Sequence, residues 1–284
     1  MLRIWTRKLL LVSISNLLLL CKSYAALSGS DNFDDNSKDN SKWGPDRVIL
    51  GGALAETNGR LEYSSDGNAI QETRRPWILN TGDSASDWEV QLDVAVNAIL
   101  PSVDQYASFG IDISNSGDLA DFVYIELYNS TAALPPNGKG FYSEIWNNDS
   151  SAGSADSSDL ASASGAVRVT YDSTSRVLRS YYDANGPIGG YSWTELGSFG
   201  VSPSGGGATA NADWGMAPNN SFIIDVYGYS DSVAVPAGSV YGDNFVAVPE
   251  PSRAAALTAL LLLLFAGTRI GLRPSNALLR KPPP

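Results

Sequence analysis

The chain has 284 residues, with 30 acidic and 19 basic residues and a formal net charge of −11. Nine basic residues but only one acidic residue lie outside residues 26–248, so that region carries 29 acidic against 10 basic residues, a net charge of −19 that repels nucleic acid and anionic lipid. The chain has no histidine, and its one cysteine is Cys21, which excludes a Ser-His-Asp triad, imidazole-bound metal and intrachain disulfides.

The first 25 residues have the three parts of a secretory signal peptide. A positively charged start precedes an apolar run over residues 9–20, and small residues follow at Ser23 and Ala25. We expect cleavage after Ala25. Two alternatives stay open: lipoprotein processing at Cys21, which the large leucine before the cysteine disfavours, and an uncleaved anchor, which the next lysine cuts short.

Residues 26–248 are predicted to form one extracytoplasmic all-β domain. In residues 88–96, Trp, Val and Leu alternate with Glu, Gln and Asp, which predicts a strand with one buried face. Residues 122–128 are nearly all apolar, which predicts a strand buried on both sides. Residues 167–171 and 177–182 flank a polar turn and predict a hairpin, whereas the Ser, Ala, Asp and Gly of residues 147–165 predict a mobile loop.

The whole region shows no sustained helical periodicity. Roughly 12 to 14 short strands with glycine-rich turns predict a two-sheet sandwich, most simply a jelly roll.

Three segments carry a family resemblance. They are the acidic run Asp31–Asn36 with Lys42-Trp43, the strand Asn58–Tyr63 and the hairpin that begins at Val167–Asp172. In their order they resemble concanavalin A-like, laminin-G-like domains of lectins and glucanases. The resemblance implies a jelly-roll fold and association with carbohydrate.

The chain ends in a pattern of three parts. The motif Pro249-Glu250-Pro251 is followed by an uncharged apolar run over residues 254–268, which Arg269 and Arg273 close. The apolar side chains suit a membrane-spanning helix at about residues 254–270, and the arginines resist crossing the membrane.

This pattern, over residues 249–273, resembles the PEP-CTERM sorting signal of Gram-negative surface proteins. The resemblance implies that exosortase, a membrane protease, recognises Pro249, Glu250 and Pro251, and that Arg269 and Arg273 set the topological stop before a cytoplasmic tail at residues 274–284. It implies export through the inner membrane, transient anchoring, and delivery to the cell surface or the extracellular matrix of a biofilm. An ordinary C-terminal anchor is the alternative.

Paired carboxylates are the one common catalytic device left to a chain without histidine. Glu89 and Asp93 share a face opposite an apolar one, as solvated residues do, and Asp121 and Glu126 fall on opposite sides of a strand. The alternating Glu-x-Asp-x-Glu pattern of sandwich glucanases is absent. We therefore predict no catalytic residue and no enzymatic activity; the alternative is a surface glycan hydrolase of the concanavalin A-like class that uses paired carboxylates.

Two kinds of binding residue stand out. Asp31, Asp34, Asp35 and Asp243 supply hard oxygens for a candidate calcium site, if the first and last strands pair; the alternative is a polar arm and turn. Among the aromatic residues, Trp214 lies in a predicted loop and is the first candidate for stacking on a sugar, although core packing is its alternative. The sequence thus predicts an exported structural or carbohydrate-binding protein.

Overall fold

The computed structural model describes residues 28–79, 82–132, 138–157, 160, 162–203, 206–207, 209–216 and 220–249. The chain divides into two units, Met1–Pro249 and Glu250–Pro284, and every described residue belongs to the first. The predicted signal peptide and the segment from Glu250 onward lie outside the described residues. Within the described ranges, no helix has the length and apolar character needed to span a membrane.

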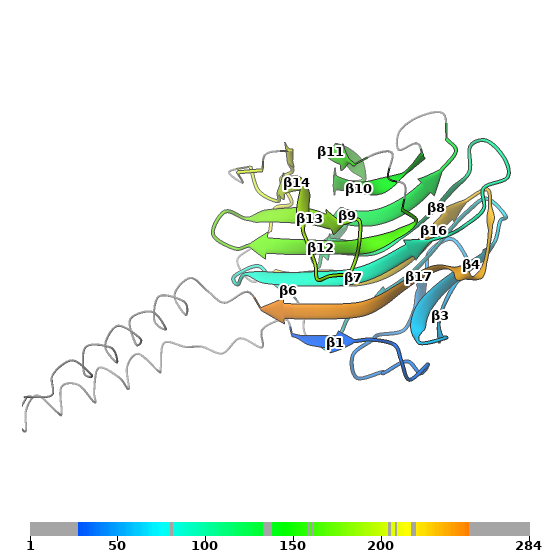
Figure 1. The fold of residues 1–284 in the computed structure, drawn as a ribbon. Coiled ribbons are helices and arrows are strands. Elements are labelled where there is room, and N and C mark those ends of the chain that lie inside the picture. The colour runs from blue at the N-terminus through cyan, green and yellow to red at the C-terminus, as the bar shows by residue number, and fades with distance from the viewer. Residues whose placement is uncertain are drawn as a thin grey trace, which may run out of the picture. The chain divides into compact units, whose positions relative to one another are not determined.

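The described residues form two β-sheets (Figure 1). Neighbouring strands pair antiparallel except for β14 and β15, which are parallel. The nine-stranded sheet runs in the order β15 (Ala210–Asn211), β14 (Thr194–Gly200), β13 (Val177–Asp183), β12 (Ser164–Asp172), β7 (Trp88–Val96), β17 (Ala234–Pro249), β4 (Arg60–Asp66) and β3 (Ala53–Thr57), with β1 (Gly29–Asp31) also paired to β17. The eight-stranded sheet runs in the order β11 (Ser150–Asp156), β10 (Gly138–Asn147), β9 (Asp118–Ser130), β8 (Tyr106–Asn115), β16 (Ser221–Asp231), β5 (Ile70–Pro76) and β2 (Arg47–Val48), with β6 (Gly82–Asp83) also paired to β16.

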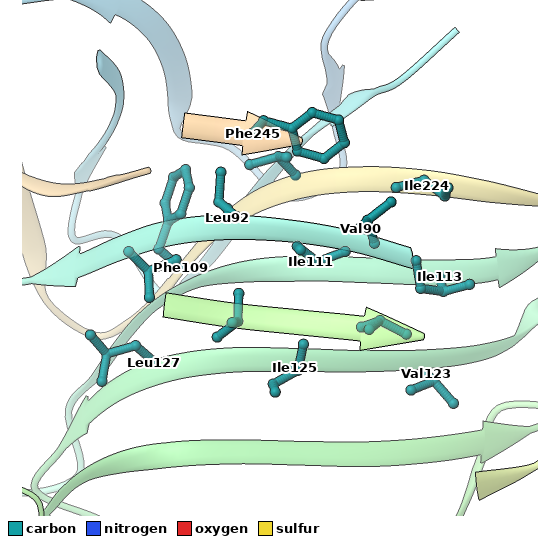
Figure 2. Packing of buried hydrophobic residues seen from close by; sticks show 14 of the residues in the cluster. Val90, Leu92, Phe109, Ile111, Ile113, Val123, Ile125, Leu127, Ile224 and Phe245 are labelled. Carbon is teal, nitrogen blue, oxygen red and sulfur yellow. The ribbon is translucent and has the colours of Figure 1, made fainter. Parts of the chain in front are cut away.

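The core lies between the two sheets. Figure 2 shows Val90 and Leu92 of β7 among side chains of β8 and β9 such as Ile111 and Ile125, and all four are essentially inaccessible to solvent. Because successive side chains of a strand point to opposite faces, one alternating set of each strand enters this core. The predicted buried face of residues 88–96 is confirmed.

The predicted hairpin is confirmed: strands β12 and β13 pair, with Thr170 opposite Arg179. The first and last strands also pair, with Asp31 of β1 opposite Phe245 of β17, which meets the condition set above for the candidate calcium site.

The prediction of a loop over residues 147–165 is wrong in part. Ser150–Asp156 form strand β11, which pairs with β10 and ends the eight-stranded sheet. All seven of its residues are exposed or half-buried, and its Ser, Ala, Gly and Asp residues give no alternating hydrophobic pattern. Its pairing rests on backbone hydrogen bonds, which a polar sequence does not reveal.

The prediction that residues 122–128 are buried on both sides is wrong in part. Val123, Ile125 and Leu127 are in the core. On the other face Glu126 and Tyr128 are buried, but Phe122 and Tyr124 are only half-buried. This second face is not packed against another layer. It lines a cleft.

Candidate functional site

A cleft of about 500 Å³ lies on the face of the eight-stranded sheet that points away from the core. Strands β5, β8, β9, β10 and β16 supply its walls, through the side chains that alternate with the core residues. Its aromatic residues are Tyr106, Phe122, Tyr124, Tyr142, Trp146, Tyr227 and Tyr229. Its acidic residues are Glu72, Asp104, Asp112, Glu126, Glu144 and Asp231, and its one basic lining residue in the described chain is Arg74.

Strand register places two glutamates close together in this cleft. Glu126 of β9 is opposite Tyr142 of β10, and Glu144 of β10 is opposite Tyr124 of β9. The two glutamates are therefore diagonal neighbours on one face, a relationship that puts residues about 7–8 Å apart.

Glu126 is held by two tyrosine hydroxyls from other strands. Tyr106 donates to Oε1 at 2.5 Å, and Tyr227 donates to Oε2 at 2.6 Å. Only 4% of Glu126 is exposed. Burial raises the pKa of this carboxyl above its ordinary value, although the tyrosine hydrogen bonds act in the opposite direction.

Gly110 explains how Tyr227 reaches Glu126 across the intervening strand β8. It lies opposite Glu126 on one side and opposite Tyr227 on the other. A Cβ at this position would lie 2.1 Å from the carbonyl oxygen of Ile125 and 2.7 Å from Cα of Glu126. The absent side chain leaves the space above β8 to the tyrosine and the glutamate.

Aromatic rings form a continuous strip beside the glutamates. The rings of Phe122 and Trp146 stack at 5.5 Å, and Tyr124 lies 6.2 Å from Phe122 and 5.9 Å from Tyr142. The Tyr124 hydroxyl donates to Oε2 of Glu144 at 2.7 Å. Phe122, Tyr124 and Glu126 alternate along β9, so the strip follows the strand direction.

Buried charges support the base of the cleft. Asp112 of β8 lies opposite Asp225 of β16. Arg74 contacts Asp112 at 3.0 Å and also pairs with Glu72, while Arg47 pairs with Asp225. Burial, and then the negative charge of Asp112, raise the pKa of Asp225 to about 7.

Trp214 is in the core and does not present its ring to solvent. It is 3% exposed, its ring lies 6.4 Å from that of Phe222, and its Nε1 donates to the carbonyl oxygen of Trp146 at 2.9 Å. The prediction of a sugar contact at Trp214 is thus wrong in this structure, because its side chain packs into the core while its neighbours Asp213 and Gly215 are exposed.

The four predicted calcium ligands lie at the start and the end of the domain. Asp31 is 8% exposed and accepts hydrogen bonds from Phe33 N and from Trp43 Nε1, so both of its oxygens are engaged within the fold. Asp34 and Asp35 follow in a turn, and Asp243 lies on β17. The described residues contain no group of three or more His, Cys, Asp or Glu side chains arranged to hold a metal ion. Calcium at this place stays a prediction.

The predicted sorting residues fall at and beyond the end of the described chain. Pro249 is the last residue of β17 and lies opposite Trp88 in the register. Glu250, Pro251, Arg269 and Arg273 lie outside the described residues.

Sequence reasoning missed Glu126 and Glu144 as members of one site. The signal that could have found them is the alternation in two segments, where aromatic and acidic residues alternate with Val, Ile, Leu or Ser at 122–128 and 142–146. Two such strands side by side would place both glutamates on one aromatic face.

Comparisons with known proteins agree with the fold. No family model matches the chain, and no curated protein matches it. Among solved structures, GH43B from a Bacteroides ovatus xyloglucan locus matches with a TM-score of 0.50 and 12% identity, over 78% of this chain and 39% of that one. Peanut lectin with a bound peptide matches with a TM-score of 0.48 and 13% identity, over 78% and 97% of the two chains. The carbohydrate recognition domain of Emp46p matches with a TM-score of 0.46 and 10% identity, over 76% and 94%.

The described chain has the all-β, two-sheet architecture that its sequence predicts. At these identities the likeness concerns the fold alone.

Proposed function

We propose that this protein is an exported surface protein that binds a polysaccharide in the cleft of the eight-stranded sheet and does not cleave it. The observation that carries the proposal is the aromatic strip of Trp146, Phe122 and Tyr124 beside the hydrogen-bonded carboxylates of Glu126 and Glu144. Aromatic rings stack on the apolar faces of sugars, and carboxylates accept hydrogen bonds from sugar hydroxyls. A cleft that follows a strand suits an extended chain ligand.

The names of two neighbours, a lectin and a carbohydrate recognition domain, point to the same class of ligand. Their similarity is one of fold, so the proposal rests on the residues of the cleft.

Affinity electrophoresis of the purified chain in gels that contain single polysaccharides tests the binding. We expect retardation by at least one polysaccharide, and loss of retardation in Trp146→Ala. Trp193→Ala is the matched control. Trp193 directly precedes β14 of the nine-stranded sheet, stacks on Tyr191 at 5.0 Å, and does not line the cleft. Unchanged retardation in Trp146→Ala would place the ligand elsewhere. Runs with calcium and with a chelator test the calcium site proposed at Asp31, Asp34, Asp35 and Asp243.

The absence of cleavage is part of the proposal, and its support is the engagement of the carboxylates. Both oxygens of Glu126 accept tyrosine hydroxyls, and Asp112 contacts Arg74 and accepts from Ser114 at 2.6 Å. Carboxylates with these hydrogen bonds and this ion pair fix the positions of the side chains that line the cleft, a structural role that does not require them to transfer protons.

Glycan hydrolysis is the second candidate function. It is favoured by one observation, that Glu126 is buried with a raised pKa and has Glu144 as its diagonal neighbour, since glycosidases use one protonated and one ionised carboxyl. Release of reducing ends from a bound polysaccharide, lost in both Glu126→Gln and Glu144→Gln, would establish it. Binding without any such release would exclude it for that polysaccharide.

Export and surface sorting are also proposed, on the sequence pattern. The signal peptide ending at Ala25, the motif Pro249-Glu250-Pro251 and the apolar segment with Arg269 and Arg273 support recognition by exosortase and transient membrane anchoring. In a host with exosortase, we expect the full chain at the cell surface or in the extracellular matrix. A chain with Pro249, Glu250 and Pro251 all changed to alanine should stay in the membrane fraction, and equal surface delivery of both would contradict the motif's role.

A further inference from the structure

We infer that the cleft discriminates by charge: it accepts a polysaccharide without acidic groups and rejects one that carries carboxylate, sulfate or phosphate. This inference rests on the proposed function and specifies the class of its ligand.

The charges that line the cleft are almost all of one sign. Among the described residues, six carboxyl groups line it, one from each of its five strands and one from Asp104 in the loop before β8, against the single guanidinium of Arg74. Recognition of an acidic sugar requires cationic side chains that can pair with it, since an unpaired anion loses its hydration without compensation.

Arg74 is not available for such pairing. Its Nη1 lies 3.0 Å from Asp112 Oδ2, its Nε donates to Glu72, and only 18% of its side chain is exposed. Its guanidinium also lies 5.8 Å from the ring of Phe122 and 6.0 Å from that of Tyr227, within the range of cation–π contacts. A ligand carboxylate would have to displace two protein carboxylates to reach it.

The negative charge of the whole domain also disfavours an anionic polysaccharide. Residues 26–248 carry a net charge of −19, so an anionic polymer is repelled before it reaches the cleft. At the cleft itself, Glu126 and Glu144 stand beside the aromatic strip, where the sugar ring would stack. An acidic substituent on that sugar would face like charges at short range.

Two polymers that share a backbone test the inference in the full chain. Hydroxyethyl and carboxymethyl derivatives of one glucan are compared by affinity electrophoresis at low and at high salt. We expect at least tenfold weaker binding of the carboxymethyl form at low salt, and a smaller difference at high salt. Binding of the carboxymethyl form as tight as that of the neutral form overturns the inference and leaves the proposed function standing. If no polymer of a broad panel binds, the proposed function fails and the inference fails with it.

A variant separates the cleft from the overall charge. Glu72→Gln removes one partner of Arg74 and should strengthen binding of the carboxymethyl polymer severalfold. Glu195→Gln changes the net charge equally, but Glu195 is 46% exposed and pairs with Arg179 at 3.8 Å outside the cleft. Equal effects of the two variants would assign the discrimination to net charge and overturn the role of the cleft.

Discussion

The Tyr227 hydroxyl of β16 donates a hydrogen bond of 2.6 Å to Oε2 of Glu126 on β9, across the intervening strand β8. The bond joins two strands that are not neighbours, and it passes over Gly110, the one residue between them in the register. The hydrogen bond to Glu126 in the cleft therefore depends on Gly110, which the sequence marks only by its lack of a side chain.

Removal of this bond should cost stability. Tyr227→Phe leaves Oε2 of the buried Glu126 without its donor, while Tyr106 still donates to Oε1. We expect the free energy of unfolding to fall by about 1–3 kcal/mol, as for a buried group left unsatisfied. Urea denaturation measures it. Tyr229→Phe is the control in the same cleft, since no described hydrogen bond joins its hydroxyl to Glu126, and an equal loss there would show that the bond to Glu126 is not the cause.

Gly110→Ala should be more disruptive than its small size suggests. The added methyl would meet the backbone of Ile125 and Glu126 at distances that carbon atoms do not tolerate, so β8 and β9 would have to separate. We expect a loss of about 1–3 kcal/mol or more and weaker polysaccharide binding. Gly206→Ala is a suitable comparison, because an added Cβ there meets nothing within 4 Å. A stable Gly110→Ala protein with full binding would show that the close approach does not matter.

The sequence predicts individual strands of this fold better than it predicts which strands pair with one another. The alternation from Trp88 to Val96 is a local property, and it predicts which face is buried. The pairing of β9 with β10 is a property of two segments, and it decides that Glu126 and Glu144 share a face. No single segment contains that information.

The misplacement of Trp214 and of residues 122–128 has one physical cause. Aromatic side chains suit both a core and the lining of a cleft, because they are apolar over most of their surface. Composition near Trp214 suggested a loop, yet the loop packs on Phe222 and the ring is covered. Tyr124, inside an apolar run, lines the cleft instead.

The ion pair between Arg75 and Glu56 should be important for holding the two sheets together. Arg75 of β5 is 3% exposed and donates to Oε1 of Glu56, on β3 of the other sheet, at 2.5 Å, and it also donates to both oxygens of Asp46. Arg75→Met leaves the buried Glu56 without its cation, which costs about 3–5 kcal/mol in comparable cases. We expect thermal and urea unfolding to show this loss.

Two variants sharpen that test. Adding Glu56→Gln to Arg75→Met should restore part of the stability, because the unpaired charge is then gone. Arg179→Met, which breaks a half-exposed pair with Glu195 at 3.8 Å, should cost no more than about 1 kcal/mol. A double variant less stable than Arg75→Met would contradict the explanation.

Asp225 should make the protein less stable as the pH rises toward neutrality. Burial raises its pKa from 3.8 to about 7, so the folded chain keeps the proton over a range in which the unfolded chain has lost it. Across that range the folded state binds more protons than the unfolded state, and the free energy of unfolding therefore falls between about pH 4 and pH 7 and levels off above it. Asp225→Asn has no proton to lose and should flatten this dependence of the free energy of unfolding on pH, most clearly between pH 5 and pH 7. The slope that remains should come from other buried carboxyls such as Glu126, whose pKa burial also raises. Urea unfolding at a series of pH values decides the matter: parallel curves for the wild type and Asp225→Asn would mean that the ion pair with Arg47 keeps Asp225 charged throughout.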